Sequence, residues 1–247
     1  MADPKKIEFE DDIVLTIRAF IKKTNQISPV MWTLFPLLIK VFEKNKRTFG
    51  NLLDTLNQYI IIGKQQLGLK REFLQLLVQM STTSIFSTEP AITVHNSEGA
   101  ILMQLLFQVY AGTSVLDEFF EGLMNQVLTR MNTQPMQDHL KRHLLSVLLT
   151  ALAYNANATL SFLSQRGLVD EFFSQLLQDK MCEGFTNVYE RKTFIIGLSS
   201  ALNAQGQLPP AMIGHMLKII QEIIRMLGRL KAQEAKALKK AAKLEIN

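Results

Sequence analysis

The chain has 247 residues, of which 47% are hydrophobic and 20% are charged. This composition excludes a disordered protein, because disordered chains lack the apolar side chains that bury a core. The single cysteine, Cys182, excludes a disulfide scaffold, and one cysteine with four scattered histidines argues against a Cys/His zinc site.

The formal net charge of +5 is concentrated at one end of the chain. Residues 225–247 contain seven Lys or Arg and two Asp or Glu, so residues 1–224 hold 20 of each sign and are neutral overall. A basic surface that runs over a whole domain is typical of nucleic-acid-binding proteins. We therefore expect no nucleic-acid groove in residues 1–224.

The N-terminal residues show no secretory signal, since they mix Lys with Asp and Glu and no apolar segment follows. We expect residues 1–10 to be disordered. The best candidate for a membrane span is residues 144–165, which carry no charge but are interrupted by Asn155 and Asn157. We expect a buried helical hairpin there and no contact with a membrane.

Apolar residues recur at helical spacing along almost the whole chain. The stripe from Ile13 to Ile21 predicts the first helix. Ser28 followed by Pro29 predicts the start of the second, because Ser is a favoured N-cap and Pro a favoured first residue. Pro36 lies inside this second helix and predicts a kink or a delayed start.

Nine further helices are expected in chain order, over residues 49–60, 69–80, 97–112, 114–128, 135–154, 158–164, 168–177, 188–202 and 209–227. Residues 82–96 are polar, contain Pro90 and predict a loop. Ser114 and Asp117 have the spacing of a capping box, with Asp in the place of Glu or Gln. No convincing run of residues alternates between apolar and polar, so strands should be absent or trivial.

About eleven helices joined by short polar breaks allow a globular bundle or a stack of helical hairpins. Helix pairs of about 40 residues are the size of HEAT-type repeats. We therefore expect an all-α fold, a HEAT-like α-solenoid of about six helical hairpins. The expected parts are a disordered stretch at 1–10, a HEAT-like helical repeat array at 11–228 and a basic helical tail at 229–247.

No enzymatic chemistry is expected. His139 and His143 have the spacing of a zinc pair, but Lys141 and Arg142 lie between them and would repel a cation, so we expect a solvated helix surface. Cys182 has no His nearby in sequence to lower its pKa, so we expect an inert thiol. No motif for acyl transfer, nucleotide hydrolysis or dinucleotide binding occurs. We predict no metal site and no cofactor.

Several segments are similar to one family. Residues 28–38, with the sequence SPVMWTLFPLL, resemble the S-P-x-M-W-x-L-x-P-L segment in C-terminal regions of importin-β superfamily (karyopherin-β) nuclear transport receptors, and are closest to the importin-seven/eight subgroup. Residues 49–59 resemble the segment that follows in this family. Residues 149–155 resemble its A-x-x-Y-x-N helix end. Residues 189–198 resemble its D-R-K-x-x-x-x-G-L helix, with Glu190 where Asp is usual. The matches occur in the family's order.

This resemblance implies a fragment of a longer α-solenoid superhelix, from the C-terminal segment of a receptor that carries cargo through nuclear pores. It implies cargo proteins and FG-repeat nucleoporins as partners, and a Ran GTPase bound through N-terminal repeats absent from this chain. It also implies a location in the cytoplasm, the nucleus and the nuclear envelope or pore. The family's receptors tend to continue with an acidic stretch, whereas residues 230–247 are basic.

Asp117, Glu118 and Glu121 are candidate partner contacts, because the family's cargo signals are basic and these acids share one helix face. The alternative is that they complement the dipole at a helix start.

Glu190, Arg191 and Lys192 either contact a partner or pair with a neighbouring repeat. Trp32 either packs in the core between repeats or borders a pocket for a Phe side chain of pore proteins. The basic tail is either a solvated last helix or a contact for RNA, a membrane or an acidic protein. The alternative function is a HEAT-type scaffold of another cytosolic assembly, such as a vesicle coat or a phosphatase.

Overall fold

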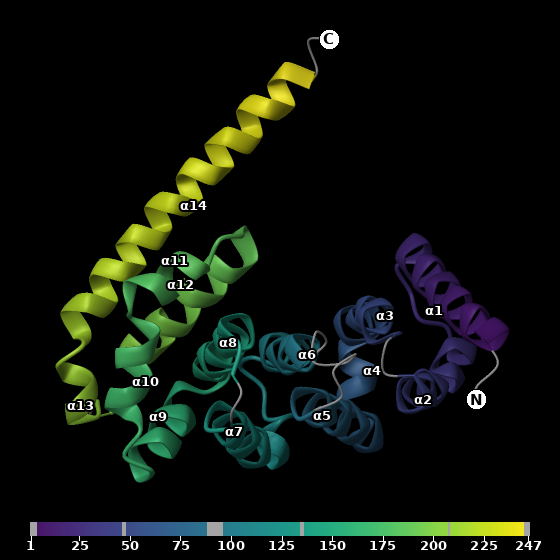
Figure 1. Ribbon diagram of the computed structural model, residues 1–247, viewed down its shortest axis with the longest axis horizontal. Coiled ribbons are helices and arrows are strands. Elements are labelled where there is room, and N and C mark those ends of the chain that lie inside the picture. The colour runs from purple at the N-terminus through teal and green to yellow at the C-terminus, as the bar shows by residue number, and fades with distance from the viewer. Residues whose placement is uncertain (1–3, 46–47, 88–95, 134–135, 207, 245–247) are drawn as a thin grey trace. The chain divides into compact units, whose positions relative to one another are not determined.

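The computed structural model describes residues 4–45, 48–87, 96–133, 136–206 and 208–244, with side chains from residue 11 to residue 238 within those ranges. These ranges contain fourteen helices and no strand (Figure 1), which confirms the all-α prediction. The chain divides into two compact units, Met1–Val147 and Leu148–Asn247, and the boundary falls inside one helix. Within the described ranges, no helix has both the length and the apolar character needed to cross a bilayer.

The helices of the first unit are α1 (Pro4–Thr24), α2 (Pro29–Lys44), α3 (Phe49–Ile62), α4 (Lys64–Gly68), α5 (Arg71–Ile85), α6 (Asn96–Val109), α7 (Asp117–Met131) and most of α8 (Asp138–Tyr154). Inside this unit, α1 packs on α3, α3 on α6, and α5 on both α6 and α7. Each helix thus buries its apolar face against helices that are close to it in sequence. That pattern is typical of a helical-repeat array, in which repeats contact only their neighbours.

The second unit contains the end of α8 and α9 (Ala156–Gln165), α10 (Val169–Leu176), α11 (Asp179–Gly184), α12 (Val188–Leu202), α13 (Pro210–Ile213) and α14 (Met216–Leu244). Here α12 packs on both α9 and α14, and α10 packs on α9, α11 and α13. α14 is one continuous helix, and it contains the position near residue 228 at which the repeat array was expected to give way to the tail.

The predicted start of α2 is confirmed. The side chain of Ser28 accepts a hydrogen bond from the backbone N of Met31 at 3.4 Å, and Pro29 is the first residue of α2. α2 is therefore not delayed by Pro36, and it continues through that residue to Lys44. Pro90 and most of the expected loop around it lie outside the described residues.

Two predictions of local structure are wrong or incomplete. α7 begins at Asp117 rather than at Ser114, and no side chain caps it. Gly112 has a φ of +73° and leads into a turn in which the N–H of Asp117 donates to the carbonyl of Ser114, so the expected capping box does not form. The helices α4 and α11 were not foreseen, because five or six residues are too few to display a helical period. The helix predicted over 209–227 is interrupted at residues 214–215, between α13 and α14.

A glycine marks a close approach of two helices in each unit. A β-carbon built on Gly99 of α6 would lie 2.5 Å from the carbonyl oxygen of Ser81 in α5. In the second unit, a β-carbon on Gly197 of α12 would lie 2.6 Å from the carbonyl oxygen of Leu149 in α8. Because backbone atoms cannot yield to a side chain, these helices pack this closely only where a side chain is missing.

We expect the substitution Gly99→Ala to lower the free energy of unfolding by about 2 kcal/mol, because the added methyl group forces α5 and α6 apart. Gly122→Ala is the matched control, since Gly122 lies within α7 and has no atom within 4 Å of its added carbon. It should raise the stability by about 0.5–1 kcal/mol, through helix propensity. Urea unfolding followed by circular dichroism measures both, and a Gly99→Ala chain as stable as the parent would contradict the close contact.

Candidate functional site

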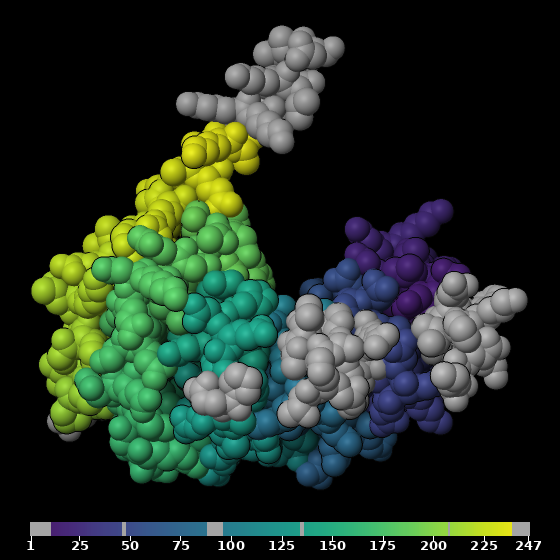
Figure 2. All heavy atoms as spheres, in the orientation of Figure 1, coloured from purple at the N-terminus to yellow at the C-terminus, as the bar shows by residue number. Residues whose placement is uncertain are grey.

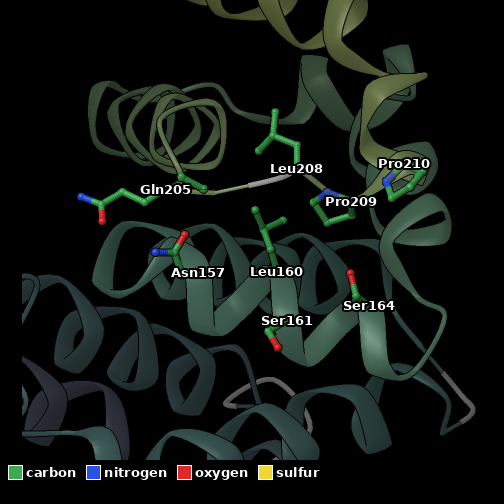
Figure 3. A pocket seen from close by; sticks show the side chains of 9 residues that line it. Asn157, Leu160, Ser161, Ser164, Gln205, Leu208, Pro209 and Pro210 are labelled. Carbon is green, nitrogen blue, oxygen red and sulfur yellow. The ribbon is translucent and has the colours of Figure 1, made fainter.

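A pocket of about 400 Å³ lies in the second unit, between α9 and the segment that joins α12 to α13 (Figure 3). Leu160 points from α9 toward this segment, and Pro209 and Pro210 close one side. The described residues that line it are Asn157, Leu160, Ser161, Ser164, Ala204, Gln205, Leu208, Pro209 and Pro210.

Local sequence fixes both walls of this pocket. The Asn155 side chain caps α9 by accepting a hydrogen bond from the backbone N of Ala158 at 3.0 Å, which stops α8 and starts α9 at a defined place. On the other wall, Pro210 is the first residue of α13 and follows Pro209, so two prolines restrict the backbone.

The pocket is suited to binding and not to catalysis. The described residues of its lining include no titratable side chain, so they offer no general acid or base that could activate the hydroxyls of Ser161 and Ser164. Leu160 and the two prolines supply apolar surface, while Ser161 and Ser164 place hydroxyl groups beside it. An uncharged apolar or aromatic side chain with a polar backbone nearby fits this combination.

Trp32 lies inside an aromatic cluster made by α2, α3 and α5 and exposes only 7% of its surface. Its ring centroid is 6.1 Å from that of Phe35, 5.4 Å from that of Tyr59 and 6.2 Å from that of Phe73. The hydroxyl of Tyr59 donates to the carbonyl of Met31 at 2.7 Å, and burial raises the pKa of Tyr59 to about 12. The structure thus places Trp32 in the core, and its contact with a partner stays a prediction.

Asp117, Glu118 and Glu121 are all exposed on the first turns of α7. Glu118 also forms an ion pair with Arg71 of α5, and both side chains of this pair reach solvent. Exposed ion pairs of this kind contribute little to stability. The arrangement is compatible with both interpretations, a complement to the helix dipole and a surface that attracts cations.

The segment 190–192 is split between different roles. Glu190 completes a capping box with Asn187, and its carboxylate also accepts a hydrogen bond from the backbone N of Thr186 at 2.9 Å. Arg191 connects α12 to α14, because its Nη1 donates to Oε1 of Gln233 at 2.7 Å. Lys192 is exposed. The three residues therefore do not act as one cluster, and their contact with a partner also stays a prediction.

The two histidines of α8 belong to a hydrogen-bonded interface with α6. The Nε2 atoms of His139 and His143 are 3.2 Å apart, so one ring donates to the other. Nδ1 of His139 lies 2.8 Å from Oγ of Ser97, and Nε2 of Gln104 donates to the carbonyl of His143 at 3.1 Å. The expectation of a simple solvated surface is therefore wrong for His143, which is half-buried. Within the described residues, no group of three or more His, Cys, Asp or Glu could hold a metal ion.

Cys182 is fully buried in the second unit and donates from Sγ to the carbonyl of Leu176 at 3.3 Å. Burial, with a smaller contribution from the nearby carboxylate of Glu222, raises the pKa of this thiol to about 12. A nucleophilic cysteine needs a lowered pKa and access to solvent. The Cys182 thiol has neither.

We expect Cys182 to react with Ellman's reagent at pH 8 about a thousandfold more slowly in the native chain than in the unfolded chain, because a pKa near 12 leaves little thiolate. The raised pKa also destabilises the fold in base. The neutral, buried thiol contributes to the free energy of unfolding at pH values below its ordinary pKa of 9.0. This stabilising contribution is lost as the pH rises toward 12. Stopped-flow absorbance gives both rates, and native and unfolded rates within tenfold of each other would contradict this burial.

α14 carries a second apolar stripe besides the one that packs on α12. Ile219, Met226 and Leu230 are buried, whereas Leu217, Ile220, Ile224 and Leu227 are exposed by between 42% and 70%. The sequence predicts one apolar helix over 209–227, which contains all of these residues except Leu230, and assigns Leu230 to the basic tail. Their spacing could have separated the two stripes, because residues three and four apart lie on the same face of a helix. The pocket beside α9 had no such signal, since its two walls lie some 40 residues apart in sequence.

Comparison with known proteins shows what the chain is similar to. Residues 2–243 match the family described as "Importin-11-like, TPR repeats". The chain is 26% identical to Importin-8 of Homo sapiens over 233 residues, which are 91% of this chain and 22% of that protein. It is 22% identical to a probable importin-7 homolog of Dictyostelium discoideum over 237 residues, which are 90% of this chain and 21% of that protein. The chain thus spans about a fifth of the length of these relatives. No solved structure matches.

Proposed function

The chain belongs to the importin-11-like TPR repeat family, and from this membership we propose that it is a segment of a nuclear transport receptor, from the C-terminal part of a longer chain. The observation that carries the proposal is the family match over residues 2–243. The resemblance of residues 28–38 and 189–198 to C-terminal motifs of importins seven and eight supports the position. The family match also favours transport over a vesicle-coat or phosphatase scaffold.

The proposed mechanism is binding through the surfaces of packed helices. Cargo proteins and FG-repeat nucleoporins bind these surfaces, and Ran GTPase acts through other repeats of the whole receptor. The receptor moves between cytoplasm and nucleus through the nuclear pore. TPR repeats, which the family description names, and HEAT repeats, which the sequence analysis expected, are both stacks of helix pairs. Either kind offers a wide surface and no catalytic centre.

The pocket beside α9 is the proposed contact for nucleoporins. A Phe ring enters between Leu160 and the two prolines, and the hydroxyl of Ser164 bonds to the peptide backbone next to the ring. Burial of one ring gives a weak contact. Weak contacts suit a repetitive partner, because many copies of the motif act together.

We expect the substitution Ser164→Trp to weaken binding of an FG-repeat peptide at least about fivefold, because the indole fills the pocket. Ser174→Trp is the matched control, since Ser174 is exposed on α10 and is not part of the lining. Binding is measured by NMR titration, with a peptide whose Phe residues are replaced by Ser as the negative ligand. Failure of the parent chain to bind the FG-repeat peptide, or equal losses in both variants, would refute the nucleoporin contact.

A further inference from the structure

A second pocket of the second unit, of about 350 Å³, has cationic side chains at half of its lining positions. We call it the cationic pocket. It lies between the start of α12 and the middle of α14, two helices that pack on each other (Figure 1). Its lining consists of Thr186, Arg191, Arg229, Ala232, Gln233 and Lys236. Three of these six residues are positively charged, and none is acidic.

Arg191 is held in a fixed position at the base of this pocket. Its Nε donates to the carbonyl of Phe185 at 3.1 Å, and its Nη1 donates to Oε1 of Gln233 at 2.7 Å. Two anchored donors restrict the rotamers of the long side chain, so the guanidinium group is oriented before a ligand arrives. No described residue accepts a hydrogen bond from its Nη2.

No side chain that the structure describes in this unit neutralises the charge of the cationic pocket through an ion pair. Among the side chains that the structure describes, neither Arg191, Arg229 nor Lys236 forms an ion pair with a carboxylate. The nearest acid in sequence, Glu190, is bonded to backbone N–H groups in its capping box. Glu234 lies on another face of α14, because two residues of a helix separate it from Lys236 by about 200°.

From this arrangement we propose that the cationic pocket binds an acidic peptide segment of a partner protein, through carboxylate side chains. Arg229 and Lys236 are seven residues apart and so lie on one face of α14, separated by about 10 Å along the axis. A peptide in the polyproline II conformation advances about 3.1 Å per residue and has three residues per turn, so side chains three positions apart lie on the same face of the peptide. Two carboxylates three positions apart therefore match the two cations, with the Arg191 guanidinium between α12 and α14 as the third contact.

A peptide fits the pocket better than a nucleic acid does. Proteins that bind single strands combine a long basic track with aromatic side chains on which bases stack. The lining of this pocket contains no aromatic residue, and residues 1–224 are neutral overall. The cationic pocket shares no lining residue with the pocket beside α9 proposed for nucleoporins, so binding of an acidic peptide does not depend on nucleoporin binding.

The test uses the 247-residue chain and a fluorescein-labelled peptide with two Glu residues three positions apart in a Gly/Ser background. Fluorescence anisotropy should show saturable binding that weakens as salt is added. Lys236→Glu and Arg229→Gln should each raise Kd about tenfold. Lys231→Glu is the matched control, because it makes the same charge change as Lys236→Glu on the same helix at a residue outside the lining. It should raise Kd less than about twofold.

Two further comparisons, one with a variant of the chain and one with a variant of the peptide, test whether binding depends on the geometry of the pocket as well as on its charge. Arg191→Lys keeps the charge but removes the planar guanidinium, and it should raise Kd about threefold to fivefold with an unchanged circular dichroism spectrum. A peptide with the same two Glu residues adjacent should bind about threefold more weakly than the spaced one. The proposal is overturned if the spaced peptide does not bind, if Lys231→Glu weakens binding as much as Lys236→Glu, or if an oligouridine of equal charge binds the pocket more tightly than the peptide.

Discussion

The packing of α14 on α12 is the contact on which the surfaces of the second unit depend. The buried face of α14 carries Ile219, Met226 and Leu230 and also Glu222, which is only 3% exposed and lies near Cys182 of α11. A buried carboxylate is costly unless it is paired. Arg225 lies 2.6 Å from it and Lys218 3.3 Å from it, both on α14 itself. Both cationic side chains that pair with the Glu222 carboxylate therefore belong to α14 itself, and no described residue of α12 forms an ion pair with this carboxylate.

The same contact brings together residues that are distant in sequence. Arg191 of α12 reaches Gln233 of α14 only because the two helices are packed, and the cationic pocket exists only where they meet. The pocket beside α9 likewise needs the chain to return from α12 to α13. Family membership supports only the general role proposed for the chain, while the two pockets proposed to bind partners are particular to these packed helices.

The sequence predicted the long helices well and the surfaces poorly. Helices such as α2 and α12 were found because an apolar period persists over 15 or 16 residues. The start of α7 was missed because Gly112 adopts a left-handed turn that competes with the capping pattern of Ser114 and Asp117. No local pattern shows whether Trp32 is buried, since aromatic residues of α3 and α5 enclose it. Both pockets combine residues about 40 positions apart, and a periodicity analysis cannot pair such residues.

α14 extends beyond the helices on which it packs, so its C-terminal turns lack tertiary support among the residues up to 238. Of the residues of α14 up to 238, Leu230 is the last that is buried, and between 231 and 238 only Gln233 is partly covered. Figure 2 shows this part of the helix extending away from the rest of its unit. Helical segments of that size gain little from their own hydrogen bonds in water. Alanine and lysine, both strong helix formers, supply most of the support there. Binding of a partner to these turns would therefore be coupled to ordering of the helix backbone. The affinity of that partner would change with temperature and with each Ala→Gly replacement along the exposed turns.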